Sequence, residues 1–68
     1  MITEEVGKRI RELRIQSEIS QEKLALRAGL DRTYLAGVES GKRNPSLKSL
    51  EKIIKALNTS FEVLFRNL

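Results

Sequence analysis

The stretch QEKLALRAGLDRTYLAGVES, residues 21–40, contains two short segments with helical spacing and a brief interruption between them. Ser20 precedes the first segment and Asp31 precedes the second, and both residue types cap helices by accepting a hydrogen bond from the first turn. Gly29 follows the first segment, where a helix end often needs a left-handed backbone. The pattern predicts two helices that meet across a tight turn.

Small and apolar side chains indicate how these two helices pack. Ala25 suits a close crossing, because a larger side chain there would push the helices apart. The residues expected to seal the pair against the rest of the domain are Leu24, Ala28, Leu30, Leu35 and Val38. Two helices that cross sharply over a turn of about three or four residues form a helix-turn-helix, which we expect at residues 21–40.

The chain before Ser20 predicts one more helix. Thr3 is expected to cap it, since Glu4 and Glu5 follow near its positive end. Val6, Ile10 and Leu13 recur at helical spacing and define one apolar stripe, and QSEIS (residues 16–20) breaks the pattern.

The chain after Ser40 predicts two further helices. Gly41 is expected to end the third helix as Gly29 ends the second, and Pro45 cannot continue a helix from the residue before it. Ser46 then caps a fourth helix, for which Asn58 is a left-handed terminator. Its expected inward residues are Leu47, Leu50, Ile53, Ile54 and Leu57.

A short fifth helix is expected at the end of the chain, with Thr59 or Ser60 as its cap. The residues expected to serve the core from this helix are Phe61, Leu64 and Phe65. Five short helices without a strand signal predict an all-α protein, and 68 residues predict one small domain, residues 1–68.

Composition excludes several classes of function. The chain has no cysteine and no histidine, which removes thiolate sites, the commonest metal ligand and the commonest general base. We also find no phosphate-binding loop and no clustered acidic pair. We therefore expect no enzyme, no metal, no catalytic residue and no cofactor.

Charge and hydropathy indicate the partner and the compartment. The net charge is +4, which favours a polyanionic partner such as nucleic acid but is also compatible with ordinary solubility. The N-terminus does not resemble a signal peptide, and no stretch is apolar enough to span a membrane. We expect a cytoplasmic protein without a membrane partner.

Several motifs carry a family resemblance: SQEKLA (20–25), AGL (28–30), VESGKRNPSL (38–47) and ALNTSFEVLF (56–65). The chain resembles the phage-repressor-like (Xre-type) helix-turn-helix domains. Within them, the run DRTYLAGVESGKRNPSLKSLEKI is most similar to the controller proteins of restriction–modification systems. The resemblance implies a five-helix lambda-repressor-like DNA-binding domain.

The function implied by this resemblance is that of a sequence-specific transcriptional regulator on double-stranded DNA, specifically an autoregulatory controller of a restriction–modification operon. Its partners would be a palindromic operator, a second copy of the chain and, for an activator, RNA polymerase. The alternative is an antitoxin-like protein or a phage or plasmid repressor that acts through protein interaction as well as DNA.

The helix after Asp31 is the expected reading element, because the N-terminal end of such a helix contacts bases in the major groove. Arg32 is a candidate for a bidentate contact to guanine, although a solvated arginine is the simpler alternative. Thr33 could contact a thymine methyl. The Tyr34 hydroxyl could donate to DNA, or its ring could merely cover the helix pair. Ala36 and Gly37 would let the backbone approach the groove.

Phosphate contacts are expected around this helix. In the family, a glutamine at the place of Gln21 donates to a backbone phosphate; otherwise Gln21 would be an exposed polar residue. Ser40 shares the groove face, and Lys42, Arg43 and Asn44 follow in the next loop, where cations attract phosphates. Asn44 could instead bond its own backbone as a turn residue.

Two further features are structural. The resemblance implies an ion pair between Arg14 and Glu39, which we assign to the scaffold. Val63 and Leu68 are expected to point away from the core, which would be unremarkable for single aliphatic residues. Clustered beside the fourth helix, they would form a two-fold dimer interface, and the family commonly dimerises through its last two helices.

Overall fold

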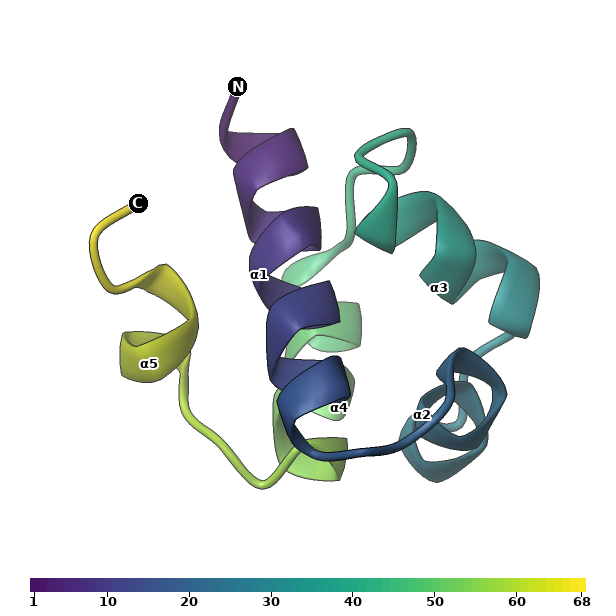
Figure 1. The fold of residues 1–68 in the computed structure, drawn as a ribbon. Coiled ribbons are helices and arrows are strands. Elements are labelled where there is room, and N and C mark those ends of the chain that lie inside the picture. The colour runs from purple at the N-terminus through teal and green to yellow at the C-terminus, as the bar shows by residue number, and fades with distance from the viewer.

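The structure is a computed structural model that describes residues 1–68. It consists of five α-helices and no strands: α1 (Ile2–Gln16), α2 (Gln21–Ala28), α3 (Arg32–Glu39), α4 (Leu47–Ala56) and α5 (Phe61–Phe65). Helices α1 and α4 occupy the middle, with α2 and α3 on one side and α5 on the other (Figure 1). The predicted all-α, five-helix architecture is confirmed.

Most of the predicted helix boundaries are correct, because local hydrogen bonds determine them. The side chains of Ser20, Asp31 and Ser46 each accept a hydrogen bond from the first turn of α2, α3 and α4. Gly29 and Asn58 adopt the expected left-handed backbone, with φ of 68° and 56°.

The predicted cap at Thr3 is wrong. Helix α1 begins at Ile2, because the N–H of Glu5 already donates to the carbonyl of Met1 at 3.1 Å. Thr3 therefore lies inside the first turn. The ammonium group of Met1, the N-cap residue, donates to the Glu4 carboxylate at 3.3 Å, within the first turn.

One apolar core joins the five helices. Its members are Val6, Ile10, Leu24, Ala25, Leu35, Val38, Leu50, Ile53, Ile54, Leu57 and Leu64. The pair α2–α3 contributes Leu24, Ala25, Leu35 and Val38, as the pattern in residues 21–40 predicted. The prediction that this pair packs against the rest of the domain is therefore correct, and the structure shows that α3 packs against α1 and α2 against α4.

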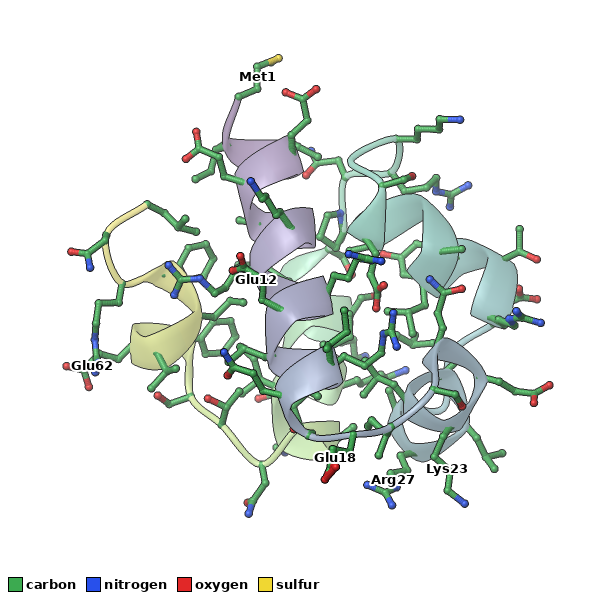
Figure 2. The ribbon with its side chains drawn as sticks, viewed as in Figure 1. Met1, Glu12, Glu18, Lys23, Arg27 and Glu62 are labelled. Atoms are coloured by element: carbon green, nitrogen blue, oxygen red, sulfur yellow. The ribbon has the colours of Figure 1, made fainter.

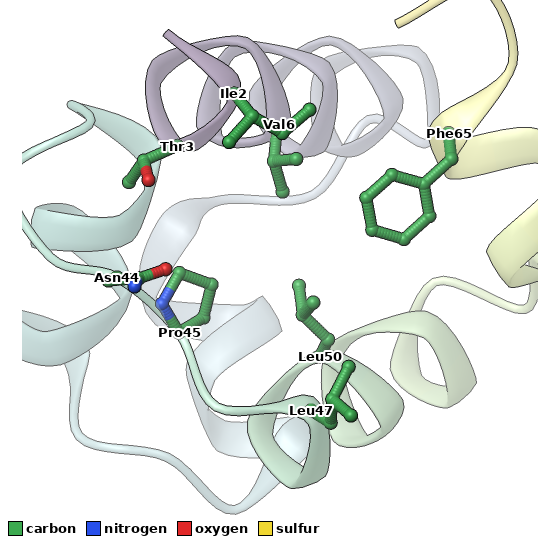
Figure 3. A pocket seen from close by; sticks show the side chains of 8 residues that line it. All are labelled: Ile2, Thr3, Val6, Asn44, Pro45, Leu47, Leu50 and Phe65. Atoms are coloured by element: carbon green, nitrogen blue, oxygen red, sulfur yellow. The ribbon is translucent and has the colours of Figure 1, made fainter.

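Three residues predicted to lie in the core are instead exposed. Leu47 is 76% exposed, because the first turn of α4 borders an unfilled hollow beside Ile2 and Phe65 (Figure 3). Phe61 and Phe65 are 39% and 37% exposed. A five-residue helix has one inner face, and Leu64 takes it with no exposure.

Helices α1 and α3 cross in direct backbone contact at Gly7. A Cβ atom there would collide with the carbonyl oxygen of Val38, so the crossing requires glycine. On the other side of α1, Arg9 holds the end of α5: its two Nη atoms donate to the carbonyls of Val63 at 2.9 Å and Arg66 at 2.8 Å. Neither role was predicted from the sequence.

Candidate nucleic-acid interface

Helix α3 presents one face to solvent and buries the other. Leu35 and Val38 are fully buried, whereas Arg32 and Thr33 at its N-terminal end are exposed. The cap at Asp31 fixes this end: its carboxylate accepts a hydrogen bond from the N–H of Thr33 at 2.7 Å. The structure therefore brings the expected base-reading side chains to one accessible helix end.

The middle of this face is covered by a neighbouring side chain. Arg43, from the loop after α3, lays its aliphatic stem over Gly37, where a Cβ atom would collide with its Cγ. Its guanidinium carbon lies 5.0 Å from the centre of the Tyr34 ring. The expectation that Gly37 lets the backbone approach the groove is thus corrected, because the stem of Arg43 occupies the space.

The loop after α3 is anchored on one carbonyl group. The oxygen of Gly37 accepts hydrogen bonds from the backbone N–H groups of Lys42 at 2.9 Å and Arg43 at 3.0 Å. The hydroxyl of Ser40 donates to the same oxygen at 3.1 Å. The loop cations therefore stand beside the exposed face of α3, around a shallow groove that also borders Asp31 and Thr33.

Gln21, at the start of α2, is tied to the scaffold. Its Nε2 donates to Oε1 of Glu39 at 3.2 Å. Glu39 is 7% exposed and also pairs with Arg14, through Nε at 2.8 Å and Nη2 at 3.1 Å. Arg14 in turn donates to the carbonyl of Ile19 at 3.0 Å. Gln21 is therefore not simply an exposed residue: its carboxamide is oriented by a buried carboxylate.

The remaining predicted residues lie elsewhere. Asn44 is exposed and borders the apolar hollow rather than the groove. Val63 is partly buried and Leu68 is 40% exposed. Helix α5 and the C-terminus lie on the side of the molecule opposite α3 (Figure 1). The structure does not bring these two residues to the exposed face of α3.

Phe61, Phe65 and Leu47, which were expected in the core, instead belong to an apolar surface around α5. The rings of Phe61 and Phe65 stack with centroids 6.3 Å apart and planes 5° apart. Phe65 also borders the hollow with Ile2 and Leu47 (Figure 3). We call this surface the α5 patch; its members are Ile2, Leu47, Phe61 and Phe65, together with Leu68, whose N–H donates to the carbonyl of Phe65 at 3.1 Å. The i, i+4 spacing of the two phenylalanines was the available signal.

Charged side chains also project from the surface. Figure 2 shows Lys23 and Arg27 of α2 and Glu62 of α5 pointing away from the body of the molecule. No three His, Cys, Asp or Glu side chains cluster as a metal site would require. None of the five helices combines the length and the apolar character that a membrane span requires.

Known proteins are similar to this chain in sequence and in fold. A family described as helix-turn-helix matches residues 10–64. The control protein C.BamHI of Bacillus amyloliquefaciens is 50% identical over 52 residues, which cover 75% of this chain and 64% of that protein. The chain thus spans just under two thirds of that relative's length.

Two solved structures match over nearly the whole chain. The restriction–modification controller protein C.AhdI from Aeromonas hydrophila is 46% identical with a TM-score of 0.90, over 93% of this chain and 96% of that one. The controller protein C.Esp1396I, solved as a tetramer in complex with its natural 35 base-pair operator, is 40% identical with a TM-score of 0.89, over 96% of this chain and 86% of that one. This chain therefore belongs to the Xre-type helix-turn-helix family, with restriction–modification controller proteins among its relatives.

Proposed function

We propose that this protein is a sequence-specific, double-stranded DNA-binding transcriptional regulator that reads its operator with α3. The observation that carries the proposal is the exposed N-terminal end of α3, flanked by the cations Lys42 and Arg43. The solved operator complex of C.Esp1396I supports it, since that fold matches this one closely. We propose no catalytic activity.

Base reading is assigned to the solvent face of α3. Arg32 would donate to guanine O6 and N7, and Thr33 would contact a thymine methyl. Tyr34 would donate its hydroxyl to a base or phosphate while its ring packs against the core. Ala36, which is partly exposed, would let the groove approach the helix backbone, whereas the stem of Arg43 covers Gly37.

Phosphate binding is assigned to the margins of the same face. Lys42 and Arg43 would neutralise phosphates beside α3. Gln21 would donate its second amide hydrogen from the start of α2, while Glu39 holds the first. Ser40 and Asn44 are the weaker members, since the Ser40 hydroxyl already donates within the loop and Asn44 borders the hollow.

The α5 patch is assigned to self-association. Two-fold dimers place two recognition helices about 34–36 Å apart on a palindromic site. Stacked aromatic rings next to an unfilled apolar hollow form a surface that a second copy can cover. Val63 and Leu68 remain in this proposal, with Phe61 and Phe65 added to them.

The controller proteins among the relatives support a more specific biological role. We propose an autoregulatory controller of a restriction–modification operon that acts in the cytoplasm as a single domain over residues 1–68. A controller represses by covering a promoter, or activates by presenting a surface to RNA polymerase.

Selection of bound duplexes from a random pool tests the proposal. We expect a palindromic consensus with half-sites one helical turn apart, and a variant Arg32→Ala should lose preference at one position of each half-site. Recovery of no consensus by the unmodified protein would contradict DNA reading and favour a protein-interaction role such as that of an antitoxin.

A further inference from the structure

Arg43 and its neighbour Lys42 are both exposed loop cations, but only Arg43 contacts an aromatic ring. The guanidinium of Arg43 lies over the Tyr34 ring, 5.0 Å from its centre, within the range of a cation–π contact. No ion pair of the structure includes Arg43. The aromatic ring, and not a carboxylate, therefore holds this guanidinium in place.

Gly37 makes the contact possible. The Cβ and Cγ atoms of Arg43 occupy the space in which a side chain at position 37 would lie. The N–H of Arg43 also donates to the Gly37 carbonyl at 3.0 Å, which fixes where the stem begins. Gly37 thus provides a slot on the surface of α3 through which Arg43 reaches the ring.

Tyr34 is held on two sides as a result. Part of its ring packs against the apolar core of α2, α3 and their neighbours, and the guanidinium covers another part. The core restrains only part of the ring, and the guanidinium adds a second restraint. The contact fixes the direction of the phenol at the edge of the exposed face of α3.

We propose that Arg43 is a positioning residue: it orients Tyr34 for DNA through the slot at Gly37, whereas Lys42 acts only through its charge. The inference rests on the proposed DNA-reading function and deepens it. It predicts that a lysine at position 43, which keeps the charge but lacks the planar guanidinium, cannot replace arginine.

The DNA-free protein provides the first test, because Tyr34 is the only tyrosine of the chain and its ring NMR signals are unambiguous. Arg43→Lys and Gly37→Ala should both shift these signals, since each removes the guanidinium from the ring. Lys42→Ala is the matched control and should leave them in place. Ring signals that are unchanged in Arg43→Lys, or moved equally by the control, would overturn the proposal.

The second test compares affinity for a duplex recovered by the unmodified protein with affinity for a scrambled duplex of equal length. Arg43→Lys should lower this ratio by about three- to tenfold, but should have no further effect on it in a Tyr34→Ala background. Lys42→Ala should weaken both duplexes equally. An equal loss with and without Tyr34 would show that Arg43 acts independently of the ring.

The two proposals fail in different ways. An unmodified protein that does not distinguish the duplexes refutes the proposed function. The ring signals of the DNA-free protein then decide by themselves whether Arg43 positions Tyr34.

Discussion

The carboxylate of Glu39 at the end of α3 accepts two hydrogen bonds from the guanidinium of Arg14 on α1, at 2.8 and 3.1 Å. Both side chains are largely buried, and Gln21 donates to the same carboxylate from α2. One ionic group therefore joins the two helices of the helix-turn-helix to the helix that supports them. The orientation of α3 depends on this junction.

Removal of Arg14 should destabilise the fold strongly. Arg14→Met leaves the Glu39 carboxylate buried with only Gln21 as a partner, and an uncompensated buried charge costs about 3–5 kcal/mol. Urea unfolding measures the change in the free energy of unfolding. Arg11→Met, on the exposed side of α1, is the matched control and should change it by less than about 0.5 kcal/mol. A loss of similar size in both variants would argue against the junction.

Gly7→Ala should also destabilise the protein, although alanine is the better helix former. Its Cβ would collide with the backbone carbonyl of Val38, which cannot move without shifting α3. Overpacking of this kind costs about 1–3 kcal/mol. Gly37→Ala is the comparison, since only the flexible stem of Arg43 must yield there, and its effect on thermal unfolding should stay within about 1 kcal/mol. Equal effects would mean that α1 and α3 are not in rigid contact.

Arg32→Ala and Lys42→Ala should weaken DNA binding in different ways. The loss of a bidentate base contact at Arg32 should cost about 1–3 kcal/mol on the selected site and relax one base position. The loss of a phosphate contact at Lys42 should weaken all sequences alike and reduce the salt slope by about one. Affinity titrations at several salt concentrations separate the two effects, and an unchanged consensus for Arg32→Ala would remove it from base reading.

Leu68→Asp should convert a dimer into a folded monomer with much weaker operator binding. Leu68 is 40% exposed in the α5 patch, so a charge there disrupts a self-complementary surface without entering the core. Sedimentation measures the mass. Val63→Asp tests the same interface, with a greater risk to folding because Val63 is partly buried.

The control for this interface is Leu26→Asp, which changes an equally apolar residue that is 75% exposed on α2. It should remain dimeric. A monomeric unmodified protein, both free and on operator DNA, would rule out the dimer.

The sequence by itself determined the helices, because their ends depend on groups only a few residues apart. Ser20, Asp31 and Ser46 each bond a backbone N–H two or three positions ahead, and Gly29 needs only its own φ of 68°. Helical spacing likewise identified the buried faces of α2 and α3. Those faces in turn placed Arg32 and Thr33 on the outside.

Only the tertiary structure decided which partners meet across the fold. Gly7 touches α3, Gln21 shares the carboxylate of Glu39, and Arg43 reaches Tyr34, all between separate elements. Apolar spacing also predicted that Leu47 points inward. Leu47 is nevertheless exposed, because the neighbouring elements leave a hollow beside it, which spacing along one helix does not reveal. Periodicity determines the direction of a side chain around its own helix, whereas burial depends on what the other helices place opposite it.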